Sequence, residues 1–203
     1  KVVVKQAVTG GGFGGKEDFP DMISAHAALL ALRTGKSIKI IYERQEDINS
    51  TTKRHPARIV HRTAVGEDGS LLAMDIEVLL DGGAYVTLSP VVLSRAVIHA
   101  GGAYRCPNVR IQGRVLATNT APNGAFRGFG APQSIFGVER HMDKIARLLG
   151  MDPYSLRLHN AYRVGDTTPT GQLLSESVSA VECLEEAVRR SDYLEKWKGF
   201  EAA

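Results

Sequence analysis

The sequence predicts an α+β fold, a mixed sheet that contains an antiparallel hairpin and is flanked by helices. Two β-branched runs, Ala57 to Val65 and Leu71 to Leu80, flank the turn-forming segment Gly66 to Ser70, which predicts the hairpin. Apolar residues recur at helical spacing in the last third of the chain. Strands and helices do not alternate regularly, which favours α+β over a strictly alternating βαβ sheet.

The first 42 residues predict a strand, a helix and a second strand. Val2 to Val8 is rich in β-branched residues and is predicted to be a strand that leads into a glycine-rich loop. Apolar residues from Asp18 to Leu32 fit a helix, and Gly35 is well placed to end it. Ser37 to Tyr42 again predicts a strand.

Further elements are predicted after the hairpin, where apolar segments are separated by glycines. The segment from Pro90 to Ala100 predicts a helix, and Val109 to Thr118 predicts a strand. Three more helices are expected, at Ser134 to Leu149 with Gly150 after it, from Asp152-Pro153, and at Val178 to Arg190.

Composition excludes several classes of protein. The 203 residues are 43% hydrophobic and 23% charged, as in an ordinary soluble domain of one or two compact units. The net charge is +3, and the charged residues are scattered along the chain, so we expect no nucleic-acid partner. No apolar run approaches the roughly 20 residues that cross a bilayer, so we expect no membrane span. Cys106 and Cys183 stand alone, which predicts a reducing, cytoplasmic location. The start at Lys1 without methionine predicts that the true N-terminus is missing.

The first glycine loop, Gly10 to Gly15, allows competing interpretations. It fits the dinucleotide pattern GxGxxG between a predicted strand and a helix, with Glu43 as a candidate ribose-binding acid. With Lys16 it also imitates a phosphate-binding loop, but Glu17 stands where a hydroxyl should bind magnesium. The bare backbone provides free amides for an anion in any case.

Two aromatic side chains in glycine frames point to a flat, anionic ligand. Phe13 in the first loop is either a lid on the core or the wall of a planar pocket. A second loop, Phe126 to Gly130, repeats the combination of aromatic and cationic side chains between glycines, which favours the pocket. The six histidines, including His26, His55 and His99, lack metal-ligand spacing and are interpreted as surface or core residues.

These motifs resemble those of the xanthine dehydrogenase and aldehyde oxidase family, and most closely those of xanthine dehydrogenases. The matching motifs are GGGFGGKE at Gly10 to Glu17, AFRGFG at Ala125 to Gly130, and the segments Tyr42 to Asp47, Leu93 to Ala96 and Pro107 to Val109. The resemblance covers residues 1–165 best, followed by a helical tail at 166–203. It implies that residues 1–203 form part of a molybdopterin-binding domain.

The resemblance also implies a cofactor and its contacts. The cofactor is Mo-molybdopterin, and its contacts are Gly12, Phe13, Gly14 and Arg127. Phe13 and Arg127 would lie near the molybdenum, with no side chain as a metal ligand. Amides and a guanidinium suit a dianionic oxo-thiolate centre.

A purine-like substrate such as xanthine or hypoxanthine is implied by three further positions. Glu17 and Arg95 would bind the polar edge of the heterocycle and support catalysis, and Phe129 would stack on its ring. An ordinary salt bridge between Glu17 and Arg95 is the alternative, and the aldehyde-oxidising members have apolar residues at these positions. Asp18 and Phe19 differ from the animal enzymes and leave the substrate open.

By resemblance, the reaction is hydroxylation with water as the oxygen source, as in purine catabolism. Electrons would leave through 2Fe-2S clusters to FAD on other domains or subunits of an oligomeric parent enzyme. The glutamate that serves as general base in this family has no match after residue 165, so we expect a fragment that is inactive alone. A dinucleotide-binding domain and a non-catalytic assembly domain remain alternatives.

Overall fold

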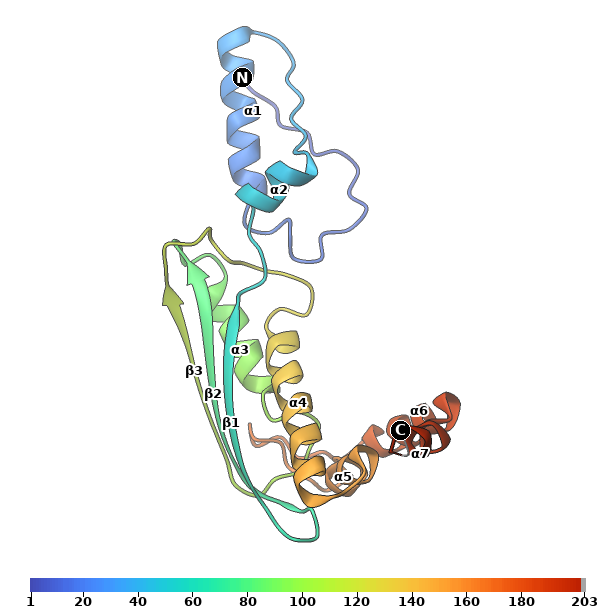
Figure 1. Ribbon diagram of the computed structural model, residues 1–203. Coiled ribbons are helices and arrows are strands. Elements are labelled where there is room, and N and C mark those ends of the chain that lie inside the picture. Colours follow the sequence, from blue (N-terminus) through green and yellow to red (C-terminus); the bar gives the residue numbers. More distant parts are fainter. Residues whose placement is uncertain (202–203) are drawn as a thin grey trace. The chain divides into compact units, whose positions relative to one another are not determined.

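The computed structural model describes residues 1–201, which form helices and strands in two compact units (Figure 1). Unit 1 comprises Lys1–Arg58, Val78–Val97 and Gly113–Gln133; unit 2 comprises Ile59–Glu77, Ile98–Gln112 and the chain from Ser134 on. The elements are α1 (Pro20–Thr34), α2 (Arg44–Ser50), β1 (Ala57–Val65), β2 (Leu71–Gly83), α3 (Ser89–His99), β3 (Val109–Ala117), α4 (Ala131–Leu149), α5 (Pro153–Asn160), α6 (Ala180–Ser191) and α7 (Tyr193–Glu201).

The sheet is mixed and has the strand order β1-β2-β3. A turn joins β1 to β2, in which the Gly66 amide donates to the Ser70 carbonyl at 2.9 Å and Gly69 takes a φ of +86°. The arrowheads of β2 and β3 point the same way in Figure 1, and α3 connects these two parallel strands. The predicted α+β class with its hairpin is therefore confirmed.

In unit 1, α3 packs on β3 because the strand carries a glycine at the contact. A Cβ atom on Gly113 would lie 2.9 Å from Leu93 Cδ1 and closer than van der Waals contact to Val97. Val92 and Ala96 of the same helix are fully buried. The glycine therefore lets the helix approach the sheet closely.

In unit 2, the core lies between β2 and α4. Met74 and Ile76 point from the strand into this core, and Val138, Met142 and Ala146 follow each other at intervals of four on one helix face. All five side chains are nearly or fully buried, as the amphipathic helical pattern predicts. Asp152 begins α5 by accepting a hydrogen bond from the Ser155 amide at 2.8 Å.

Most predicted elements are found, but two predicted strands are wrong. Val2 to Val8 and Ser37 to Tyr42 are extended coil, because β-branched residues form a strand only beside a partner and these segments pair with none within residues 1–201. The short helix α2 was not predicted. In it the Glu43 amide donates to the Glu46 carboxylate at 2.9 Å, a capping box that has Glu rather than Ser or Thr at its first position. Helix α7 lies within the predicted helical tail at 166–203, but its bounds were not predicted.

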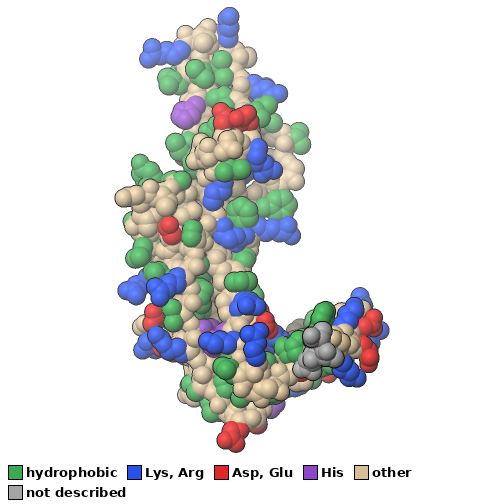
Figure 2. Space-filling view, in the orientation of Figure 1, with side chains coloured by type: hydrophobic (Ala, Val, Ile, Leu, Met, Phe, Trp, Pro, Cys, Tyr) green, Lys and Arg blue, Asp and Glu red, His purple; other side chains and the backbone are tan. Residues whose placement is uncertain are grey.

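Two surface findings bear on the class of protein. Among residues 1–201, no helix is both long and apolar enough to cross a membrane. Figure 2 shows Lys and Arg side chains dispersed among uncharged atoms on the visible face, not gathered into one continuous patch.

Candidate functional site

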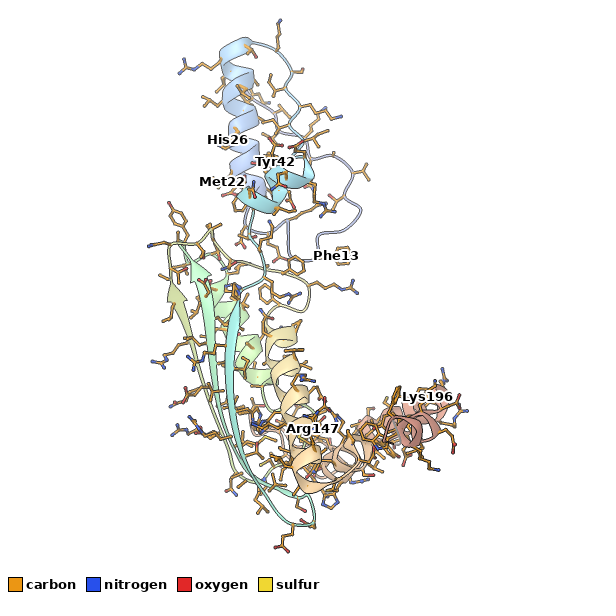
Figure 3. The ribbon with its side chains drawn as sticks, in the orientation of Figure 1. Phe13, Met22, His26, Tyr42, Arg147 and Lys196 are labelled. Atoms are coloured by element: carbon orange, nitrogen blue, oxygen red, sulfur yellow. The ribbon has the colours of Figure 1, made fainter. Side chains whose placement is uncertain are left out.

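The first glycine loop exposes its aromatic side chain. Phe13 adopts a left-handed φ of +49°, and its side chain, labelled in Figure 3, is 66% exposed. A Cβ atom on Gly11 would lie 2.7 Å from the Phe13 ring, so only glycine leaves room for the ring beside it. Phe13 is therefore not a lid on the core of unit 1.

The same loop leaves backbone donors available. The Gly15 amide donates to the Gly12 carbonyl at 2.9 Å and closes a tight turn. Within the described chain, the amides of Gly12, Phe13 and Gly14 have no hydrogen-bond acceptor. Successive free amides of this kind form a concave anion-binding surface.

The second loop is a tight glycine turn against α3. The Phe129 amide donates to the Phe126 carbonyl at 2.7 Å, and Gly128, Phe129 and Gly130 all have positive φ values, of +88°, +51° and +99°. A Cβ atom on Gly130 would clash with the Val92 carbonyl of α3. Glycine is therefore required where the loop approaches the helix.

The two loops contact each other inside unit 1. A Cβ atom on Gly14 would lie 2.7 Å from the Ala125 carbonyl carbon and 2.7 Å from the Phe126 nitrogen, so the two backbones touch. The guanidinium carbon of Arg127 lies 5.3 Å from the centre of the Phe13 ring, within cation–π range. The structure thus brings Arg127 beside Phe13 and Gly14, which precede it by more than 110 residues in sequence.

The segment before β1 holds the second loop, and sequence reasoning missed this. The Gly124 amide donates to the Lys53 carbonyl at 3.0 Å, and the Arg54 guanidinium donates to the Arg127 carbonyl at 2.5 Å. The Asp18 carboxylate lies 3.5 Å from the Ala125 amide. No spacing rule links these positions, because they meet only through the tertiary fold.

His55 is a buried core residue beneath the site, as one of the two sequence interpretations expected. It is 1% exposed, and its Nε2 lies 2.7 Å from the Ser89 hydroxyl. Burial lowers the pKa of His55, and the carboxylate of Asp81 opposes this shift. The imidazole is therefore neutral at physiological pH and helps to fix the segment that holds the second loop.

The three predicted substrate residues all belong to unit 1. Phe129 is half-buried, whereas Glu17 and Arg95 are exposed. Within residues 1–201, neither Glu17 nor Arg95 forms an ion pair, so the alternative of an ordinary salt bridge is not found. Arg95 directly precedes Ala96, against which the second loop packs at Gly130.

The dinucleotide interpretation required a parallel sheet with Glu43 beside the first loop. No strand precedes or follows the loop in residues 1–43, and Glu43 instead caps α2. The structure therefore lacks the strand–loop–helix context that this pattern needs, and the interpretation is wrong.

Comparisons with known proteins agree on one family. Residues 1–161 match the molybdopterin cofactor-binding domain family. The chain is 43% identical over 187 residues to the nicotinate dehydrogenase large molybdopterin subunit of Eubacterium barkeri, covering 92% of the chain and 44% of that protein. It is 40% identical to a probable xanthine dehydrogenase subunit of Bacillus subtilis (strain 168), covering 97% of the chain and 26% of that protein.

A solved structure has the same fold. The aldehyde oxidoreductase from Desulfovibrio gigas superposes with a TM-score of 0.80 at 41% identity, covering 90% of this chain and 20% of that one. The chain spans less than half the length of each of these three relatives. The family match over residues 1–161 nevertheless shows that the chain belongs to the molybdopterin cofactor-binding domain family of xanthine dehydrogenases and aldehyde oxidoreductases.

Proposed function

We propose that this chain supplies the two-loop part of the active site of a molybdenum hydroxylase that oxidises a purine-like N-heterocycle such as xanthine or hypoxanthine. The observation that carries the proposal is the contact of the two glycine loops at Gly14, with the Arg127 guanidinium over the Phe13 ring. This arrangement combines free amides, a cation and aromatic faces in one place.

The residues present fit an anionic, planar cofactor. The amides of Gly12, Phe13 and Gly14 lack acceptors among the described residues, and in the same part of the chain Arg127 has no carboxylate partner. A dianionic molybdenum centre with a pterin would supply the acceptors that these donors lack. A side chain larger than hydrogen at Gly14 would force the loops apart.

Each of these groups has a proposed role toward the cofactor. Gly12, Phe13 and Gly14 would hold it through the loop backbone, and Arg127 would balance its negative charge. The bound cofactor would supply the two-electron oxidation, in which a ring C–H and water give a C–OH group, two protons and two electrons. Phe13 would exclude water from one side by its exposed ring.

The substrate would contact Glu17, Arg95 and Phe129. The exposed carboxylate and guanidinium are free to hydrogen-bond a heterocycle, and the half-buried Phe129 ring offers a stacking surface. Two relatives support an N-heterocycle by name, since nicotinate and xanthine are both of this chemical class. An aldehyde or another N-heterocycle is the second candidate, because the solved aldehyde oxidoreductase shares the fold at 41% identity.

The remaining parts of the enzyme would come from elsewhere in the parent protein. We propose 2Fe-2S clusters and FAD on other domains or subunits as electron acceptors, and a general base from another segment, because the chain covers only 44% and 26% of two relatives. A cytoplasmic location suits the two free thiols, Cys106 and Cys183. A non-catalytic assembly domain is the less favoured alternative, because it gives no role to the successive free amides beside the Arg127 guanidinium.

Isotope labelling tests this function. The intact parent protein, purified with its natural partners, is supplied with xanthine in water enriched in oxygen-18. The mass of the product is then measured by mass spectrometry. We expect the new oxygen to carry the label. Product that takes its oxygen from O2, or no product from xanthine, hypoxanthine, nicotinate or an aldehyde, contradicts the proposal.

A further inference from the structure

The Arg54 side chain contacts the second loop and the first turn of α4, which directly follows that loop. Its Nη2 donates to the Arg127 carbonyl at 2.5 Å, and its Nη1 donates to the Gln133 side-chain oxygen at 3.3 Å. Its guanidinium carbon lies 4.6 Å from the centre of the Phe126 ring. No carboxylate within residues 1–201 pairs with it.

The geometry of the second loop explains why an external hold is needed. Gly128, Phe129 and Gly130 have positive φ values in succession, and a left-handed conformation is strained for phenylalanine. Such a conformation persists only when its surroundings fix it. Arg54 binds the chain on both sides of this strained part, at Arg127 before it and at Gln133 of α4 after it.

We infer that Arg54 is a positioning residue that fixes the backbone of Arg127, so that the Arg127 guanidinium lies over Phe13 and faces the anionic cofactor. The part that concerns the cofactor rests on the proposed function, whereas the hold on the loop does not. The planar guanidinium is required because it donates to two acceptors and stacks on a ring at the same time, which an ammonium group cannot do.

The neighbouring cation shows the difference between the two roles. The Lys53 ammonium donates to the Asp47 carbonyl at 2.6 Å and to the Thr51 hydroxyl at 2.6 Å, so its side chain stabilises its own turn. The Arg54 side chain instead reaches more than 70 residues along the chain. Burial also lowers the pKa of Arg54, in agreement with a partly desolvated cation.

Amide hydrogen exchange tests the hold on the loop directly. The intact protein is prepared without cofactor, as wild type, as Arg54→Met and as Arg114→Met. Arg114 is an exposed arginine of unit 1 whose side chain forms no hydrogen bond or ion pair among the described residues. We expect about tenfold faster exchange in the peptide at 124–131 for Arg54→Met only, because a hydrogen bond from a charged donor is lost. Peptides from the part of α4 that follows Val138, away from the Gln133 contact, serve as the internal reference.

Cofactor content provides the second readout. We expect the molybdenum and pterin bound per chain to fall about fivefold or more in Arg54→Met, and to recover in part in Arg54→Lys, which keeps the charge but not the fork. If Arg54→Met does not fold, Phe126→Leu removes the stacking contact alone and is expected to speed exchange in the same peptide by about two- to threefold.

The outcomes separate the inference from the proposed function. Unchanged exchange at 124–131 overturns the hold on the loop, and faster exchange with full cofactor content overturns the link to the cofactor. Wild-type protein without molybdenum contradicts the proposed function instead, and the exchange result on cofactor-free protein still decides the role of Arg54.

Discussion

Arg127 in unit 1 and Arg157 in unit 2 use the same guanidinium group in opposite ways. Arg157 is 17% exposed, and it donates to Glu139 at 2.9 Å and to Asp143 at 2.8 Å. Glu139 also accepts a hydrogen bond from the Tyr104 hydroxyl at 2.8 Å. Arg127 is exposed and, within residues 1–201, contacts a ring but no carboxylate.

The comparison shows how to separate structural charge from functional charge. A cation whose donors are all used by the fold stabilises that fold, and removing it leaves carboxylates without a partner. A cation without a carboxylate partner contributes little to stability but creates a positive potential that attracts an anion. The predictions below test this division between the two units.

The largest expected effect is on stability in unit 2. Arg157→Met is expected to lower the free energy of unfolding by about 2–4 kcal/mol, because Glu139 and Asp143 lose a shared, mostly buried partner. Denaturant unfolding measures the loss. Arg127→Met is the matched variant in unit 1, expected to change the free energy of unfolding by less than about 0.5 kcal/mol while bound molybdenum is lost. Similar unfolding for both variants would break the comparison.

The next largest expected effect is on molybdenum content, and it tests the contact between the two glycine loops in unit 1. Gly14→Val is expected to reduce molybdenum content about 30- to 100-fold, because valine at a φ of +92° is strained and its Cβ would lie 2.7 Å from the other loop's backbone. Gly10→Ala is the control, since nothing lies within 4 Å of a Cβ there. Elemental mass spectrometry of both variants measures the effect. Equal molybdenum content in the two would contradict the loop contact.

A third prediction concerns the pH dependence of stability that partly buried His61 causes in unit 2. His61 stacks on His141 with ring centres 4.3 Å apart, and burial, with a smaller contribution from His141, lowers its pKa from 6.5 to about 4. The folded protein therefore keeps His61 neutral where the unfolded chain binds a proton. Stability from this group is present above pH 6.5 and falls by about 2 kcal/mol as pH drops towards 4.

Replacing His61 separates its contribution to the pH dependence of stability from that of the carboxylates that titrate in the same pH range. His61→Phe keeps a ring in the stack but has no titration, so its free energy of unfolding should depend less steeply on pH between 6.5 and 4 than that of wild type. Denaturant unfolding at several pH values measures both curves. Parallel curves would show that His61 is accessible to protons in the folded state.

The smallest effect concerns Arg95, the exposed cation of the proposed substrate site in unit 1. Arg95→Met is expected to reduce purine turnover about tenfold more than aldehyde turnover, because an oxidised purine has ring carbonyl oxygens away from the reacting carbon for the guanidinium to bind, whereas a simple aldehyde has only the carbonyl that reacts. Steady-state kinetics of the parent enzyme on both substrates measures the ratio. Equal losses on both would remove Arg95 from the substrate site.

Local signals predicted much of the fold. Gly35 ends α1 with a φ of +65°, and the turn from Gly66 to Ser70 joins β1 to β2 as the sequence indicates. These features depend on residues close together in the chain. Val2 to Val8 failed as a strand, because β propensity specifies a strand only when a neighbour offers a ladder of hydrogen bonds.

The candidate site was predictable only where residues carry motifs. Phe13 and Arg127 were singled out because each lies between glycines. In the structure the guanidinium carbon of Arg127 lies 5.3 Å from the centre of the Phe13 ring. Arg54 has no motif, since its role depends on a fold that joins it to a loop more than 70 residues away. A hydrogen bond between residues so far apart leaves no recognisable pattern in a single sequence.

The molybdenum content per chain of the intact protein, purified with its natural partners from a host that makes the cofactor, tests the central claim most directly. Elemental mass spectrometry should give close to one molybdenum atom per chain, held where the two glycine loops meet. Absence of molybdenum from protein whose other cofactors are in place would contradict the account and favour a non-catalytic assembly role.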